Sequence, residues 1–249
     1  MKNIYMFLVR LCSLLFAGQR KTQVTYLMSF GNNNEFVSRL AERIAPLKLN
    51  VYYQHEVEND VQELKTIKTI QLTEFDNGSF VFFKLIPQLM RSKLILIDNY
   101  YPFMGGIIKT KRMRVSQLWH ANGAIKEFGF SDPSTERRRP SAQVRFQRVY
   151  DVLDDIFVGS QKMADIFQIN YRLDGHQMRK LGYPRSDKFS DKNWVTQARD
   201  KFFTRYPELK DKRLILYAPT YRKGVKFSFA PGFENLKLPK NTVLILRLH

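Results

Sequence analysis

The chain has 249 residues, 44% of them hydrophobic and 14% aromatic, which is enough for a packed core and excludes a disordered chain. Its 41 Lys and Arg against 23 Asp and Glu give a formal net charge of +18. We therefore expect an anionic partner or surface: nucleic acid, anionic lipid or a phosphorylated substrate. The single cysteine, Cys12, excludes an internal disulfide and fits a reducing compartment.

Residues 4–17 form an apolar stretch that is interrupted by Arg10 and is shorter than the roughly 20 residues of a membrane-spanning helix. Placed on a helical wheel, the stretch separates into two faces. One face carries Phe7, Leu11, Leu14 and Leu15, and the other carries Met6, Arg10, Ser13 and Ala17. This pattern predicts that residues 1–22 form an amphipathic helix lying in a membrane interface. The alternative is an N-terminal helix packed on the core.

Short apolar or β-branched segments alternate with helical ones over the next part of the chain. Strands are predicted at Val24–Phe30, Asn50–Tyr53, Thr69–Leu72, Leu94–Asn99, Val115–Trp119 and Ile156–Gly159. Asn34 can cap a helix with an apolar stripe of Phe36, Leu40, Ile44 and Leu47. This βαβ rhythm predicts a mostly parallel sheet with helices on both faces. Phe80–Lys93 is helix-like with a kink at Pro87, and fits either a core helix or one resting on anionic lipid.

The strand at Val115–Trp119 runs directly into a turn of small residues, Ala121–Gly123, with His120 at the junction and a helix expected to follow. In α/β proteins, ligands bind at the carboxyl ends of strands. A titratable imidazole there, with Lys126 one turn further on, suits proton transfer beside an anionic substrate. A histidine that caps a helix or packs at a strand end fits the spacing equally well.

A second unit is predicted to begin near Ser190, within the polar, linker-like segment Asp187–Asn193. It would contain a helix at Val195–Tyr206 and strands at Leu214–Ala218 and Thr242–Leu248. Buried parallel strands need neighbours that cover their faces, and about 60 residues are too few for a nucleotide-binding half. We therefore expect the chain to be a fragment, weakly stable in its C-terminal part and largely inactive alone.

Four segments carry a family resemblance. Trp119–Lys126, Trp-His-Ala-Asn-Gly-Ala-Ile-Lys, resembles the Trp-His-…-Lys signature of the CDP-glycerol glycerophosphotransferase family, the enzymes that build wall teichoic acids. Three further segments resemble the family in the expected order: Leu181–Asp187, Ile215–Arg222 and Leu246–His249. Polymerases of the family typically read Trp-His-Gly-Thr-Pro-Leu-Lys. The version here is more similar to the primase branch, which adds the first glycerol phosphate.

This resemblance implies a glycosyltransferase-B-like α/β fold with two Rossmann-like domains. Residues 23–189 would form the acceptor-side domain, and residues 190–249 would begin a CDP-glycerol-binding domain that is apparently incomplete. The implied reaction moves glycerol phosphate from CDP-glycerol to an undecaprenyl-diphosphate-linked N-acetylmannosaminyl-N-acetylglucosamine and releases CMP. No cofactor is implied. The protein would be peripheral, on the cytoplasmic face of the cell membrane of a Gram-positive-type bacterium.

The resemblance also implies roles for individual residues. His120 would be the catalytic base, and His249 would lie at the donor pyrophosphate. Arg185, Arg222 and Lys126 would bind substrate. Basic clusters at residues 109–114 and Arg137–Arg139, with Arg145 and Arg148, are dense enough to bind phosphates or are solvated faces.

The sequence gives little support for a metal site. The neighbouring carboxylates of Asp154 and Asp155 would point to opposite sides of an extended chain, and there is no Cys/His cluster for zinc. His55 and His176 stand outside any motif. One rival interpretation is a polymerase of the same family. Another is a nucleic-acid-binding module, which the charge allows, although we expect no nucleic-acid partner because no reader motif is present.

Overall fold

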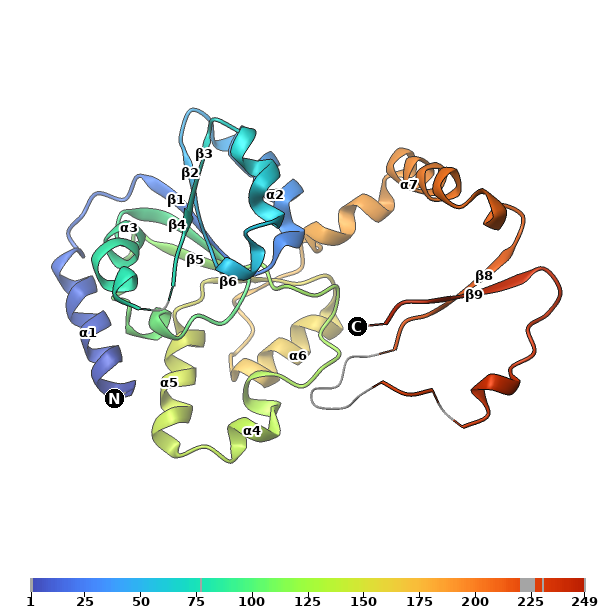
Figure 1. The fold of residues 1–249 in the computed structure, drawn as a ribbon. Helices are drawn as coiled ribbons and strands as arrows, with labels where there is room; N and C mark the ends of the chain where they lie inside the picture. The colour runs from blue at the N-terminus through green and yellow to red at the C-terminus, as the bar shows by residue number, and fades with distance from the viewer. Residues whose placement is uncertain (1, 77, 220–226, 230, 249) are drawn as a thin grey trace. The chain divides into compact units, whose positions relative to one another are not determined.

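The computed structural model of the chain describes residues 2–76, 78–219, 227–229 and 231–248 (Figure 1). It divides into two compact units, Met1–Asp187 and Lys188–His249. The division falls two residues before the predicted domain boundary. Each unit is described separately below.

Within its described residues, the first unit contains a seven-stranded parallel sheet in the order β3-β2-β1-β4-β5-β6-β7. The strands are β1 Gln23–Met28, β2 Leu49–Tyr53, β3 Ile70–Glu74, β4 Ser92–Ile97, β5 Arg114–Gln117, β6 Asp155–Phe157 and β7 Met178–Arg179. The predicted parallel α/β sheet is confirmed. The two-residue strand β7 was not predicted because it has no apolar run.

Helices cover both faces of this sheet (Figure 1). One face packs against α2, through Val37 and Ala41. The other face packs against residues of four helices and of a one-turn π-helix at Val81–Leu85. The helices of the unit are α1 Lys2–Leu15, α2 Asn34–Ile44, α3 Ile86–Leu89, α4 Pro133–Glu136, α5 Pro140–Asp151 and α6 Gln161–Tyr171. Alternate residues of the central strand β1 enter different cores, Tyr26 one and Leu27 the other, because side chains alternate across a strand.

The N-terminal helix α1 separates into an inner and an outer face. Met6, Val9 and Ser13 are buried, and Val9 lies against Gly106 so closely that a Cβ built there would be 2.8 Å from Val9 Cγ1. The outer face exposes apolar side chains, Ile4, Phe7, Leu8, Leu11, Leu14 and Leu15. The alternative of a helix packed on the core is therefore correct for the inner face, and the predicted apolar outer face is exposed. Among the described residues, no helix has the length and apolar character needed to cross a bilayer.

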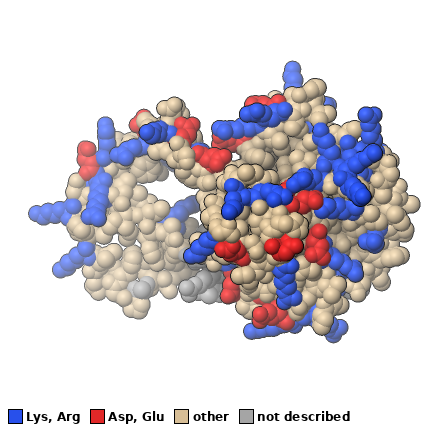
Figure 2. All heavy atoms as spheres, turned by 180° about the vertical axis from the view of Figure 1, so that it is seen from behind, with Lys and Arg blue, Asp and Glu red and all other residues tan. Residues whose placement is uncertain are grey.

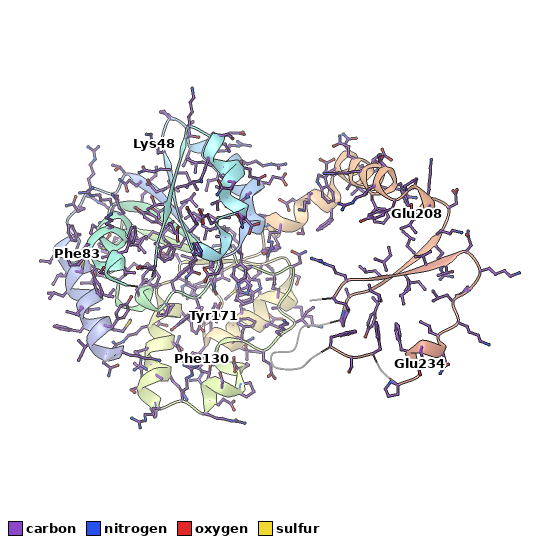
Figure 3. The ribbon with its side chains drawn as sticks, viewed as in Figure 1. Lys48, Phe83, Phe130, Tyr171, Glu208 and Glu234 are labelled. Carbon is purple, nitrogen blue, oxygen red and sulfur yellow. The ribbon has the colours of Figure 1, made fainter. Side chains whose placement is uncertain are left out.

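Two local predictions are wrong. The helix expected over Phe80–Lys93 ends at Leu89, and Lys93 already belongs to β4. Pro87 lies inside a continuous helical segment, because the π-helix Val81–Leu85 leads directly into α3. The wider π-type turn, in which the Ile86 N–H bonds to the Val81 carbonyl, makes room for the proline, and the Phe82 carbonyl accepts a hydrogen bond from Cys12 Sγ. The helix expected after Gly123 is absent, since residues 120–128 contain no regular element. Phe83, which the π-helix turns outward, is 80% exposed (Figure 3).

The second unit contains α7 Lys192–Arg205 and two strands, β8 Arg213–Tyr217 and β9 Thr242–Leu246. The strands pair in parallel, with Leu214 opposite Val243 and Leu216 opposite Ile245. The predicted helix and both predicted strands are thus confirmed to within a few residues. Asp191 caps α7 by accepting hydrogen bonds from the backbone N–H groups of Asn193 and Trp194.

Candidate active site

Three neighbouring strands of the first unit end at the candidate site. β1, β4 and β5 are adjacent and parallel, so their carboxyl ends lie on one edge of the sheet. Phe30 follows β1, Asp98 follows β4, and His120 follows β5. The sheet therefore brings together three side chains that are far apart in the sequence, at the edge where α/β proteins bind ligands.

His120 is half-buried and has a defined tautomer. Its Nδ1 lies 3.0 Å from the backbone carbonyl oxygen of Asp98. A carbonyl only accepts hydrogen bonds, so Nδ1 carries the proton and Nε2 is left with a lone pair. The ring stacks on Phe30, with 4.2 Å between centroids and an interplanar angle of 14°. These contacts fix the orientation of a group that can accept a proton.

The surroundings of His120 keep the imidazole neutral. Burial lowers the pKa of His120 below its ordinary value. The hydrogen bond to the Asp98 carbonyl raises the pKa, and the positive charge of Arg185 lowers it further. A histidine that is neutral at physiological pH is ready to act as a general base.

Arg185 lies beside this histidine, although 65 residues separate them in the sequence. Its guanidinium donates hydrogen bonds to the backbone carbonyl of His120 and, at 3.3 Å, to the hydroxyl of Tyr183. Tyr183 is buried, so it anchors the segment that carries Arg185. The arginine thus holds the His120 loop and adds positive charge next to the imidazole.

The loop that carries His120 is held open by specific contacts. Trp119 has a φ of 66°, in the left-handed region that non-glycine residues seldom adopt. Its Nε1 donates to the carbonyl of Gly123 at 3.1 Å. At the end of the loop, Gly129 has a φ of 60°, and a Cβ there would lie 2.3 Å from the Asn170 carbonyl oxygen. These contacts explain why residues 124–128 continue the loop where a helix was expected.

Asp98 is a buried residue that the sequence analysis did not single out. Its carboxyl oxygens accept hydrogen bonds from the backbone N–H groups of Ser29 and Phe30 and from the hydroxyls of Tyr26 and Tyr101. Burial raises the pKa of Asp98 to about 7, against the opposing effect of these four donors. Its side chain fixes the Phe30 turn while its carbonyl holds His120. Its position directly after an apolar strand was the available signal.

A cavity of about 600 Å³ adjoins His120 and is lined mainly by aromatic side chains and by the 119–129 loop. Tyr100, Trp119, Phe128, Tyr150 and Tyr171 contribute its rings. Tyr150 and Tyr171 stack on each other with their centroids 3.9 Å apart, and Tyr171 is buried (Figure 3). Lys126 also lines the cavity but is exposed. Flat aromatic walls with a base at one end can hold a sugar-like substrate and deprotonate its hydroxyl.

The structure thus brings His120, Arg185 and Lys126 to one region of the first unit. The other two predicted substrate-binding residues, Arg222 and His249, lie outside the described residues.

The two carboxylates of Asp154 and Asp155 have different partners, as their opposed directions predicted. Asp154 pairs with Lys109 at 2.6 Å, whereas Asp155 binds Arg114 and Arg179. Part of the 109–114 basic cluster is therefore neutralised.

Elsewhere in the first unit, His55, Glu58 and Glu74 lie close enough to hold a metal ion. In this structure His55 Nδ1 contacts the two carboxylates, at 3.7 and 3.0 Å, and all three side chains are well exposed.

A parallel α/β sheet with an oriented, neutral histidine at its carboxyl edge defines a site suited to proton transfer from a bound substrate. Comparison with known families gives the class a name. The chain belongs to the CDP-Glycerol:Poly(glycerophosphate) glycerophosphotransferase family, whose model matches residues 26–249. The family predicted from the four segments is confirmed. Membership favours an enzyme over the nucleic-acid-binding module that the charge also allowed.

Among the similar proteins, three are named teichoic acid glycerol-phosphate primase. The one from Bacillus subtilis is 28% identical over 234 residues, covering 92% of this chain and 59% of its own length. The one from Staphylococcus aureus is also 28% identical, covering 89% and 59%. The solved structure of the wall teichoic acid polymerase TagF matches 100% of this chain and 63% of its own, with a TM-score of 0.66 and 18% identity. The chain thus spans about three fifths of these relatives.

Proposed function

We propose that this protein transfers glycerol phosphate from CDP-glycerol to an undecaprenyl-diphosphate-linked N-acetylmannosaminyl-N-acetylglucosamine and releases CMP. The observation that carries the proposal is His120, a neutral base with a free Nε2 on an aromatic-lined cavity at the carboxyl edge of the sheet. Family membership supports the donor, since the family is named for CDP-glycerol. The identity of the acceptor is proposed from the resemblance to the primase branch.

In the proposed mechanism, the acceptor hydroxyl gives its proton to Nε2 of His120 as its oxygen attacks the β-phosphorus of CDP-glycerol. The bond from that phosphorus to the bridging oxygen breaks, and CMP leaves with the electron pair. The resulting imidazolium is held by the Asp98 carbonyl, which accepts from Nδ1–H. Negative charge on the transferring group needs nearby cations, and Arg185 is the nearest described candidate. Lys126, Arg222 and His249 are proposed as further substrate ligands.

We further propose a primase, which adds one unit to each acceptor. Three relatives named teichoic acid glycerol-phosphate primase align in sequence over 89–98% of the chain, whereas those named ribitol-phosphate primase or polymerase align in sequence over only 54–67% of it. A glycosyltransferase-B-like arrangement also belongs to the proposal, with residues 23–189 on the acceptor side and residues 190–249 belonging to a donor-binding domain.

A peripheral attachment to the cytoplasmic face of the cell membrane completes the proposal. The apolar outer face of α1 supports it, because α1 and α3 are in contact and the exposed Phe83 lies just before α3 (Figure 3). Apolar side chains on an amphipathic helix enter the interface, and a net charge of +18 attracts anionic lipids.

The direct test is CMP release from CDP-glycerol, measured with and without a soluble lipid-linked disaccharide. We expect release that depends on the acceptor and that falls steeply when His120 is replaced by Asn. Release that is independent of the acceptor, or equal release with CDP-ribitol as donor, would contradict the assignment. A variant at the exposed His55, which lies outside the cavity, serves as the matched histidine control.

A further inference from the structure

Positive charge is spread widely over this protein, as the face drawn in Figure 2 shows, so a cluster of cations is informative only where it forms a cavity. One cluster does so. Lys2, Arg137, Arg138, Arg139 and Arg145 surround an open cavity of about 510 Å³, together with Asn3, Ser141 and Ala142. We call this cavity the basic pocket. It joins the first turn of α1 to the first turn of α5, and Arg145 donates a 2.8 Å hydrogen bond to Asn3 Oδ1 across it.

The cations of the basic pocket are available to a ligand. Within the described parts of the chain, none of the five forms an ion pair with a carboxylate, whereas Lys109 and Arg114 of the other basic cluster do. The 12-residue helix α5 also starts here, so its positive end adds to the potential. Five unpaired cations around one cavity suit a group with at least two negative charges, such as a diphosphate.

Aromatic rings connect the basic pocket to the cavity beside His120. The Arg138 guanidinium lies over the Phe146 ring, 5.3 Å from its centroid. Phe146 in turn contacts Tyr100, with 5.7 Å between centroids, and Tyr100 lines the His120 cavity. Arg145 and Arg138 both lower the pKa of Tyr100, although burial raises it overall to about 12. The two cavities are therefore separated by little more than two rings, a spacing on the scale of a disaccharide.

The third relevant surface starts at the same place. Lys2 and Asn3 line the basic pocket, and the apolar outer face of α1 begins one residue later at Ile4. Charge for a diphosphate and apolar surface beside a lipid thus follow one another along a single helix. From His120 outward, the order is aromatic cavity, basic pocket and apolar helix face.

We propose that the basic pocket binds the diphosphate of the polyprenyl-linked acceptor. This inference rests on the proposed function, because it assigns the sugar of that acceptor to the His120 cavity. The diphosphate sets the distance between the membrane and the reacting hydroxyl. Arg138 and Arg145 are the principal ligands, since they lie on the side of the pocket that faces Tyr100.

A binding experiment on the full chain tests the site without relying on activity. The probe is farnesyl diphosphate, and the variant is Arg138→Gln with Arg145→Gln. We expect its affinity to fall about tenfold or more, since lost hydrogen bonds between charged groups have effects of this size. The charge-matched control is Arg43→Gln with Lys48→Gln; Arg43 is in the last turn of α2 and Lys48 in the turn that follows, and both are exposed. Lys48 lies remote from α5 (Figure 3). The control is expected to change affinity less than about twofold.

Arg137→Gln with Arg139→Gln provides a second variant, because both side chains are exposed and neither packs on a ring. Equal losses in the pocket variants and in the control would overturn the site and leave only net charge. A loss seen with anionic phospholipid vesicles but not with farnesyl diphosphate would assign the pocket to lipid headgroups. Weaker binding of CDP-glycerol alone would assign it to the donor. Either result contradicts the proposal.

A transfer assay separates this proposal from the proposed function. Two acceptors are compared, one with the lipid diphosphate and one with the same disaccharide on a neutral alkyl group. The pocket variant is expected to raise KM about tenfold for the first, leave kcat unchanged, and use the second as wild type does. Absence of transfer by the wild-type chain is the outcome expected if the chain is largely inactive alone, and the binding result then decides the site. Equal effects on both acceptors would refute the diphosphate assignment.

Discussion

The two faces of α1 give the sharpest prediction, because substitutions one or two turns apart should have opposite consequences. On the outer face, Leu11, Leu14 and Leu15 are 45%, 57% and 75% exposed. Together they expose the equivalent of roughly two leucine side chains. Burying one leucine contributes about 1.5–3 kcal/mol, so replacing all three by Gln should weaken membrane partition by about 3 kcal/mol or more, about 100-fold.

The inner face supplies the matched control. Val9 is fully buried against Gly106, so Val9→Ala removes two carbon groups and leaves a small cavity. We expect a loss of about 2 kcal/mol in the free energy of unfolding, with membrane partition of the folded protein unchanged. The outer triple variant should unfold like wild type, since Gln is a good helix former on an exposed face. Point variants are required because deleting the helix would uncover Gly106 and the core beneath it.

The assay is flotation with vesicles containing anionic lipid, at low and high salt, together with chemical denaturation. Added salt should release only part of the wild-type protein, because apolar insertion is not screened. If the outer triple variant floats as wild type does, the membrane role of α1 is wrong. If it loses stability as Val9→Ala does, both faces belong to the core.

Three further substitutions test the site and its support. His120→Asn should lower kcat by about 100-fold or more, and the acidic limb of the wild-type rate profile should fall below pH 6.5, because burial lowers the pKa of His120. Asp98 has a folded pKa of about 7, above its unfolded value near 4. Its contribution to the free energy of unfolding is therefore full below pH 4 and is lost as the pH rises through 7. Asp98→Asn should abolish this decrease of the unfolding free energy with pH. Asp155 behaves oppositely: burial raises its pKa, but hydrogen bonds from Arg114, Arg179 and Ser116 hold it at about 2. Asp155→Asn should therefore lower the free energy of unfolding by about 2 kcal/mol at pH 7. The difference should shrink as acid protonates the wild-type carboxyl. Equal stability curves for wild type and either aspartate variant would contradict the assigned contacts.

The sheet could be predicted from the sequence because its strands are buried on both faces and read as short apolar runs. β1 and β4 shift by only one or two residues between prediction and structure. β7 has no such run and owes its existence to pairing with β6, which local sequence does not encode. Helix α1 shows the same limit of local sequence. Its apolar outer face could be predicted from the helical wheel, whereas its packing on Gly106 depends on residues far away in the sequence.

The candidate site was only partly predictable. His120 was found from its place at the end of a strand, but its tautomer depends on the carbonyl of Asp98, 22 residues away. Asp98 itself was missed, since three of its four donors come from residues 26–30, about 70 residues earlier in the chain. The turn at Ala121–Gly123 was expected, but the segment after it was expected to be helical, and long-range contacts from Arg185 and near Gly129 decide otherwise. Tertiary contacts override local propensity most strongly around this histidine.

The most direct test of the account is the mass of the product formed from CDP-glycerol and a lipid-linked disaccharide by the full chain. The account predicts one glycerol phosphate for each acceptor even at excess donor, with equimolar CMP and with the product lost when His120 is replaced by Asn. A ladder of products carrying many glycerol phosphates would show a polymerase. Undiminished product with the His120 variant would show that the histidine is not the base.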